Sequence, residues 1–158
     1  MATSKKNTGV IRAVTRSPKE TQALARRFGA TLRPGDVIRL EGDLGSGKTL
    51  FVKGLAQGLG LKNPDAVKSP TFVIMHIYRA KVPIYHFDLY RLEGAQELDA
   101  IGMEDFTHDP GAVVCVEWAE RGPDFFPNTS KRVQIRIRGE NEREIVIRSG
   151  RRTRKAKA

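Results

Sequence analysis

The sequence lacks paired cysteines, a long apolar run and a cluster of histidines. Its 158 residues include one cysteine, Cys115, so an internal disulfide is excluded and a reducing compartment is expected. No apolar run approaches the roughly 18 residues of a membrane span, and the N-terminal residues carry no apolar signal core. The histidines lie far apart, at positions 76, 86 and 108, which does not indicate a metal cluster. These absences favour a cytoplasmic protein without membrane contact.

Acidic residues are also scarce: 18 Asp and Glu stand against 28 Lys and Arg, a formal net charge of +10. Such an excess is typical of nucleic-acid binding. Half of it, however, lies in residues 151–158, which hold five basic and no acidic residues. We expect residues 150–158 to be a disordered basic tail and residues 1–9 a flexible N-terminus. Solvation of the tail and contact with RNA or an acidic partner both fit its composition, and the remaining chain is only mildly basic.

The length and a hydrophobic content of 39% fit one domain rather than two. Hydrophobic periodicity and turn residues predict the elements that follow. Strands are expected at residues 10–14, 37–40, 71–78, 82–87, 112–116, 132–138 and 144–148. Helices are expected at residues 17–30, from Lys48 through Leu59 with Gly58 and Gly60 marking the end, and at residues 94–102. The order begins as a parallel βαβ unit and continues with antiparallel hairpins, which indicates an α/β sandwich.

The strongest local signal is residues 42–49, Gly-Asp-Leu-Gly-Ser-Gly-Lys-Thr, which satisfy G-x-x-x-x-G-K-[ST] between a predicted strand and a predicted helix. Glycines let the backbone wrap a phosphate chain, and the N–H groups then point inward at the N-terminus of the helix. Lys48 is expected to reach the β- and γ-phosphates, and the Thr49 hydroxyl to ligate Mg²⁺. The predicted nucleotide contacts are Asp43, Leu44, Gly45, Ser46, Gly47, Lys48 and Thr49. Residues 10–149 are thus predicted to form a P-loop ATPase domain: an α/β, three-layer P-loop NTPase-like sandwich with a mixed central sheet and a C-terminal β-hairpin.

A P-loop also needs an acidic group near the magnesium ion, and two candidates each end an apolar strand. Asp88 closes residues 82–88, and Glu117 closes residues 112–117. Ligands of open α/β sheets gather at the carboxyl ends of strands, so either acid can face the phosphates. One is expected to bind the ion, directly or through water, and the other to orient the attacking water.

Other residues leave two interpretations open. Ser69 and Thr71 either sense a γ-phosphate, as a switch segment does, or belong to an ordinary Ser-Pro turn. Trp118 packs on the nucleotide, on a partner or at an edge of the fold. His86 is expected to be a packed or hydrogen-bonded structural residue, and Cys115 a small core residue.

Four motifs, in order, closely resemble the bacterial TsaE (YjeE) family. They are residues 42–49, Ser-Pro-Thr-Phe at 69–72, His-Phe-Asp-Leu-Tyr-Arg-Leu at 86–92 and Glu-Trp at 117–118. The resemblance covers residues 10–149 and implies the ATPase component of the machinery that makes the threonylcarbamoyl modification on adenosine 37 of tRNAs reading codons beginning with A. It implies ATP and Mg²⁺ as cofactors, the TsaD and TsaB proteins as partners, and tRNA as an indirect partner.

The resemblance also implies roles for single residues. Lys48 and Thr49 become the phosphate and magnesium residues, Glu117 the second magnesium-associated acid and Asp88 the other active-site acid. Thr21 lies in a segment that is near the nucleotide in the family, and Arg143 resembles an arginine near the ATP. Nothing transfers to the basic tail.

Three other classes remain as alternatives. A small-molecule kinase shares the P-loop but needs a lid, and no clear lid segment lies between the P-loop and residue 117. A GTPase commonly carries an Asn-Lys-x-Asp element, which this sequence lacks. An RNA-binding module would depend on the basic tail.

Overall fold

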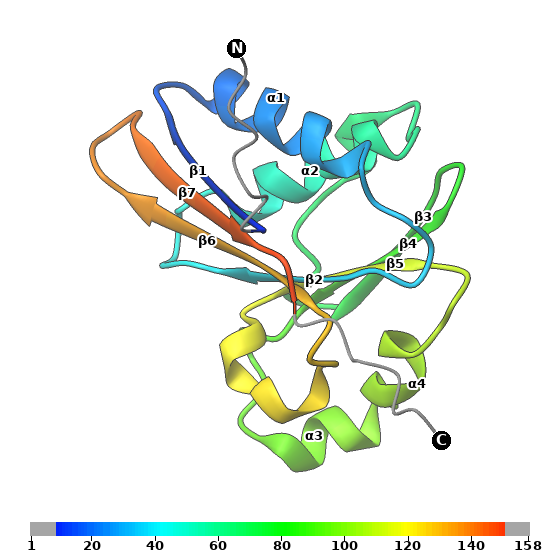
Figure 1. Ribbon diagram of the computed structural model, residues 1–158. Coiled ribbons are helices and arrows are strands. Elements are labelled where there is room, and N and C mark those ends of the chain that lie inside the picture. Colours follow the sequence, from blue (N-terminus) through cyan, green and yellow to red (C-terminus); the bar gives the residue numbers. More distant parts are fainter. Residues whose placement is uncertain (1–8, 151–158) are drawn as a thin grey trace.

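The computed structural model describes residues 9–150, which form a seven-stranded sheet with helices on both faces (Figure 1). The strand order is β1-β7-β6-β2-β5-β4-β3. The strands are β1 (Val10–Thr15), β2 (Val37–Glu41), β3 (Met75–Arg79), β4 (Pro83–Asp88), β5 (Val113–Glu117), β6 (Lys131–Ile137) and β7 (Arg143–Arg148). β2 runs parallel to its neighbours β5 and β6, and β4 runs parallel to β5. The pairs β1–β7, β6–β7 and β3–β4 are antiparallel, so the sheet is mixed, and β6 and β7 form the predicted C-terminal hairpin, with β1 as the edge strand beside it.

The sheet separates two hydrophobic cores. On one face, α1 (Pro18–Gly29) and α2 (Lys48–Gly58) pack on a core that includes Ile38, Leu40 and Cys115. On the other, α3 (Ala95–Ala100), α4 (Met103–Thr107) and the 3-10 turns Ala119–Arg121 and Pro123–Phe125 flank a second core. A further 3-10 turn, Pro64–Ala66, follows α2. This arrangement confirms the predicted three-layer P-loop NTPase-like sandwich.

The helix starts follow local sequence signals. The Ser17 hydroxyl accepts a hydrogen bond from the Glu20 N–H at 3.1 Å, and Pro18 begins α1, as the Ser-Pro pair predicts. α2 begins at Lys48, directly after Gly47 in a left-handed conformation with φ 109°. The start of α2 therefore coincides with the end of the glycine-rich loop.

Three details differ from the sequence-based expectations. The strand expected from residue 71 begins only at Met75, because residues 71–74 form a turn in which Ile74 has φ 71°. The short helix expected at residues 94–102 ends at Ala100, and Gly102, with φ 72°, directly precedes α4. β1 runs in the direction of β2 but is separated from it by β7 and β6, and it pairs with β7. The predicted flexible N-terminus and basic tail lie outside the described residues, except at Gly9 and Gly150.

Glycine permits the close crossing of α1 and α2. A Cβ atom at Gly54 would lie 2.3 Å from the Gln22 carbonyl oxygen and 2.8 Å from the Ala25 Cβ. We expect Gly54→Ala to lower the free energy of unfolding by about 1–3 kcal/mol, because the two helices must move apart. Urea unfolding followed by circular dichroism measures this. Gly139→Ala is the control, since the nearest atom there is 3.8 Å away, and an equal effect of both substitutions would show that the helix crossing is not the cause.

Candidate functional site

The loop between β2 and α2 has the backbone of a phosphate cradle. Gly45 and Gly47 have φ angles of 78° and 109°, a region that residues with a Cβ rarely adopt. No heavy atom lies within 4 Å of the position that a Cβ would take at either glycine. The space beside both glycines is therefore open, and it lies next to the N-terminus of α2, where unpaired N–H groups favour an anion.

Lys48 lies at the centre of this cradle and is 5% exposed. Its Nζ donates to the Gly42 carbonyl oxygen at 2.6 Å and to the Asp43 carbonyl oxygen at 3.0 Å. The ammonium also lies 4.1 Å from the centre of the Trp118 ring. Burial lowers the pKa of Lys48, and Glu117 and other nearby carboxylates oppose that effect. The lysine is thus held by backbone oxygens and one ring, with a positive charge that has little contact with water.

Thr49 and Glu117 face each other beside the loop. The Thr49 hydroxyl donates to the Glu117 carboxylate, with Oγ1 3.0 Å from Oε1 and 3.1 Å from Oε2. Glu117 is the last residue of β5 and the register partner of Leu40 on β2. Its carboxylate therefore lies near the start of the glycine-rich loop. A hydroxyl and a carboxylate are the oxygen ligands that Mg²⁺ prefers, with phosphates and water completing its shell. The residues present therefore fit a magnesium ion. Within residues 9–150 no group of three His, Cys, Asp or Glu is placed to bind a metal unaided.

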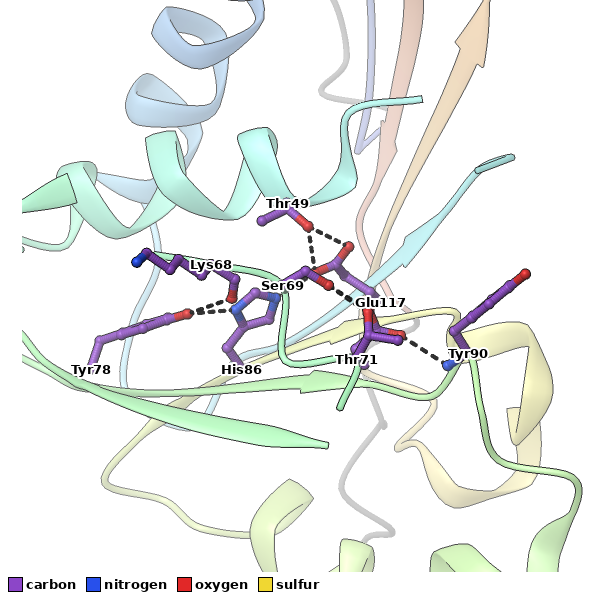
Figure 2. A network of polar contacts seen from close by, with 9 residues as sticks. Thr49, Lys68, Ser69, Thr71, Tyr78, His86, Tyr90 and Glu117 are labelled. Carbon is purple, nitrogen blue, oxygen red and sulfur yellow. Dashed lines mark hydrogen bonds and ion pairs between the residues drawn. The ribbon is translucent and has the colours of Figure 1, made fainter. Parts of the chain in front are cut away.

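A buried polar chain lies behind Glu117 (Figure 2). His86 is fully buried, with Nε2 2.6 Å from Glu117 Oε2 and Nδ1 2.8 Å from the Tyr78 hydroxyl. The same hydroxyl donates to the Lys68 carbonyl oxygen at 3.3 Å. Burial raises the pKa of Tyr78 to about 12, which keeps the hydroxyl protonated at neutral pH. His86 is hydrogen-bonded, as expected, but its contact with Glu117 is a feature that the sequence did not indicate.

Asp88 is held by a second set of donors. Its Oδ2 accepts hydrogen bonds from Ser69 Oγ at 3.0 Å and Thr71 Oγ1 at 2.8 Å, and its Oδ1 accepts from the Tyr90 N–H at 2.9 Å. Asp88 and Glu117 are register partners on neighbouring parallel strands. The two acids that the sequence singled out thus lie side by side. Ser69 and Thr71 stand at the start of the turn at residues 71–74, and both hydroxyls contact Asp88. Their sensing of a γ-phosphate stays a prediction.

Two pockets lie on opposite sides of the glycine-rich loop. The first has a volume of about 390 Å³, and its lining includes Lys48, Thr49, Asp88 and Glu117. The second, of about 220 Å³, is lined in part by Thr21 and Arg143. Both share Gly45, Gly47 and Leu50. A ligand that follows the loop would therefore reach both pockets.

Thr21 and Arg143 accordingly lie apart from the acids. The Thr21 hydroxyl is 2.6 Å from that of Thr15, and the residue is buried. Arg143 donates from Nε to the Ser46 carbonyl oxygen at 2.9 Å, so it braces the loop from the terminal hairpin. Ser46 is buried and its Oγ has no hydrogen-bond partner within the described residues. Leu44 instead projects outward with 71% of its surface exposed.

The pairing of two aromatic rings at the pocket could not be foreseen from the sequence. Trp118, with φ 58°, directly follows Glu117, and its ring lies 5.0 Å from that of Tyr90. The Trp118 ring contacts the Lys48 ammonium, and both rings line the first pocket. Trp118 therefore packs on Lys48. In the sequence, only its position next to Glu117 indicates that it lies near the site.

Comparison with known proteins agrees with this geometry. A sequence-family model described as "Threonylcarbamoyl adenosine biosynthesis protein TsaE" matches residues 15–146. A Bacillus subtilis (strain 168) protein named tRNA threonylcarbamoyladenosine biosynthesis protein TsaE is 44% identical over 132 residues, which cover 83% of this chain and 80% of that protein. A protein of the same name from Treponema pallidum is 35% identical over 137 residues, covering 87% and 99%.

A solved structure is similar as well. The crystal structure of Bacillus subtilis YdiB superposes with a TM-score of 0.71 at 36% identity, covering 90% of this chain and 86% of that one. Among the described residues, no helix combines the length and the hydrophobicity needed to traverse a bilayer. On the match of the family model and these identities, the chain belongs to the TsaE family.

Proposed function

We propose that this protein binds ATP with Mg²⁺ and hydrolyses it to ADP and phosphate, as a cytoplasmic accessory ATPase in the threonylcarbamoylation of adenosine 37 of tRNA. The observation that carries the proposal is the convergence of Lys48, Thr49, Asp88 and Glu117 on one pocket beside an open phosphate cradle. The names of the relatives, which all refer to tRNA threonylcarbamoyladenosine biosynthesis, supply the pathway.

Binding would use the loop and the two pockets together. The N–H groups at Gly45 and Gly47 and the Lys48 ammonium would contact the phosphates, with Thr49 and Glu117 on the metal side. The pocket near Thr21 and Arg143 would take the nucleoside, since it lies across the loop from the acids. A magnesium ion, when bound, would neutralise charge on the phosphate oxygens.

Hydrolysis would require different roles for the two acids, Asp88 and Glu117. The Thr49 hydroxyl contacts the Glu117 carboxylate, so Glu117 would be the acid that lies next to the magnesium ion. Asp88 receives one donor at Oδ1 and two at Oδ2, so Oδ1 keeps acceptor capacity for a water that attacks the γ-phosphate. Ser69 and Thr71 would fix the orientation of the Asp88 carboxylate during this step.

Partner proteins of the TsaD and TsaB type would dock at the rim of the same pocket. Leu44 lines the pocket, and Phe72 and Val73 directly follow the lining residue Thr71; these three apolar side chains are 71%, 81% and 60% exposed, so apolar surface is exposed beside the pocket. The Arg91 guanidinium lies 4.6 Å from the centre of the exposed Phe72 ring. Contact there would order the segment that holds Asp88, so hydrolysis is expected to be slow in the isolated protein and faster in the complex.

The test is an assay with γ-labelled ATP, with and without purified TsaD and TsaB. We expect Mg²⁺-dependent release of free phosphate that increases when the two proteins are added. Transfer of the label to an added metabolite would indicate a kinase instead, and equal turnover of GTP would contradict the preference for ATP. No association with TsaD and TsaB in any nucleotide state would contradict the accessory role while leaving ATP binding to be judged separately.

A further inference from the structure

On the sheet face opposite α1 and α2, the half formed by β1, β7 and β6 carries side chains that are not part of the proposed ATP site. Ile38 and Leu40 of β2, Val133 and Ile135 of β6, and Ile145 and Ile147 of β7 all belong to the core under α1 and α2. Side chains alternate along a strand, so the residues between these point to the opposite face. The second core, on that opposite face, contains residues of β2, β4 and β5 but none of β1, β6 or β7 in the described part of the chain. The β1-β7-β6 part of this face is therefore not covered by a helix.

Arginines dominate this uncovered region. Arg39 of β2 is the register partner of Arg132 on β6, and Arg132 is the register partner of Arg148 on β7. Neighbouring strands lie about 4.8 Å apart, so the backbone positions of these three arginines form a row roughly 10 Å long across the strands. Arg12 of β1 and Arg136 of β6 point to the same face and are exposed. We call these five residues the arginine face.

The acids nearby neutralise only part of this charge. Glu41 accepts from Arg132 Nε at 3.1 Å and Nη2 at 2.8 Å and lies 3.6 Å from Arg39 Nη2. Glu144, the other acid on these strands, pairs with Arg138, and Glu120 of the 3-10 turn Ala119–Arg121 also interacts electrostatically with Arg39 and Arg132. No hydrogen bond or ion pair among residues 9–150 involves the side chains of Arg12, Arg136 or Arg148. Within the described part of the chain, these three cations are therefore the ones not neutralised by an acid of this face.

A pocket lies beside the Arg39-Arg132-Arg148 row. A pocket of about 330 Å³ lies between Arg39, Arg132 and Arg148, and Gly150 is part of its lining. Ser130, which is 6% exposed, also lines the pocket, and its Oγ has no hydrogen-bond partner in the described structure. The five basic residues of positions 151–158 follow Gly150 directly in the sequence. The basic tail therefore starts at the edge of the arginine face.

We propose that the arginine face binds the phosphodiester backbone of RNA. Guanidinium groups match phosphate geometry with paired N–H donors, and a row of them suits a chain of phosphates better than a single anion. β1, β2, β6 and β7 contain no aromatic residue, and the ring of Phe126 in the pocket is 7% exposed and lies against the Arg39 guanidinium. Binding is therefore directed to the backbone and tolerates different sequences. The tRNA named in the relatives' descriptions favours RNA over an acidic protein. The site shares no lining residue with the proposed ATP pocket.

The test compares two double variants with the same change in charge. Arg12→Glu/Arg148→Glu alters the arginine face, and Arg26→Glu/Arg27→Glu alters exposed positions of α1 on the other side of the sheet. Binding of a fluorescent tRNA transcript to the full chain is followed by anisotropy at several salt concentrations. We expect the first variant to bind at least about 10-fold more weakly and to reduce the slope of log affinity against log salt by about 2, because two phosphate contacts are lost. The α1 variant should retain most of the affinity.

A third variant and two competing outcomes complete the test. Arg136→Glu, at an exposed position, should reduce the slope by about 1 even if the double variant does not fold. Equal losses in both double variants would attribute binding to net charge and overturn the proposal. So would the absence of RNA binding, binding of inorganic phosphate alone, or a loss that follows only from removing residues 151–158.

Discussion

Lys48→Ala is expected to weaken ATP binding at least about 100-fold while leaving the protein folded. The ammonium is the one side-chain cation at the centre of the cradle in the described structure, 5% exposed and aimed by the carbonyl oxygens of Gly42 and Asp43. Charge-assisted hydrogen bonds to phosphate contribute about 1.5–3 kcal/mol each, so losing two of them removes roughly 3 kcal/mol or more of binding free energy. The fold should persist because burial disfavours the charged lysine in the free protein, as the lowered pKa of Lys48 indicates.

Isothermal titration with ATP and Mg²⁺ measures this effect, and thermal unfolding checks the fold. Lys53→Ala is the matched control: it lies on the same helix but pairs with Asp65, whose side chain is 84% exposed. The control should bind ATP like the unchanged protein. Unchanged ATP affinity in Lys48→Ala would contradict the assignment of the loop to phosphate binding.

The local parts of the site could be predicted from the sequence because each depends on neighbouring residues. The glycine-rich loop, the strand before it and the helix after it form one continuous segment, and the structure has β2 end at Glu41 and α2 begin at Lys48. The sequence predicts Asp88 and Glu117 as acids of the site because each ends an apolar strand. Their common edge of the sheet then follows from the parallel pairing of β4 with β5.

What the sequence could not predict depends on contacts between distant segments. The bond between His86 and Glu117 joins residues 31 positions apart, and the Arg39-Arg132-Arg148 row requires the register of three strands. Likewise, β1 pairs with β7 across almost the whole chain, because the terminal hairpin inserts between β1 and β2. Residues 71–74 are Thr, Phe, Val and Ile, which favour strands, so the sequence predicts a strand there. The hydrogen bond from the Ile74 N–H to the Pro70 carbonyl oxygen closes a turn instead.

Glu117→Gln is expected to slow ATP hydrolysis at least about 100-fold and to change ATP affinity much less. Glutamine keeps the size of the side chain and an oxygen that can accept from Thr49, but it removes the negative charge next to the proposed magnesium position. Losing one preorganised charged group of an active site typically costs a factor of about 100 to 1,000 in turnover. The buried contact with His86 also changes, because an amide replaces the carboxylate oxygen that lies 2.6 Å from Nε2.

Phosphate release measured over a range of Mg²⁺ concentrations distinguishes the roles of the two acids. If Glu117 serves the metal, Glu117→Gln should require more Mg²⁺ for its remaining activity. Asp88→Asn should instead keep the Mg²⁺ requirement and lose turnover at saturating Mg²⁺, because its carboxylate is proposed to orient water. Asp99→Asn, at an exposed position of α3, is the control and should behave like the unchanged protein. The opposite result, with the Mg²⁺ requirement shifted only in Asp88→Asn, would exchange the two roles: the segment of Ser69 and Thr71 would then hold the metal-binding acid, and the His86–Tyr78 chain the one that orients water.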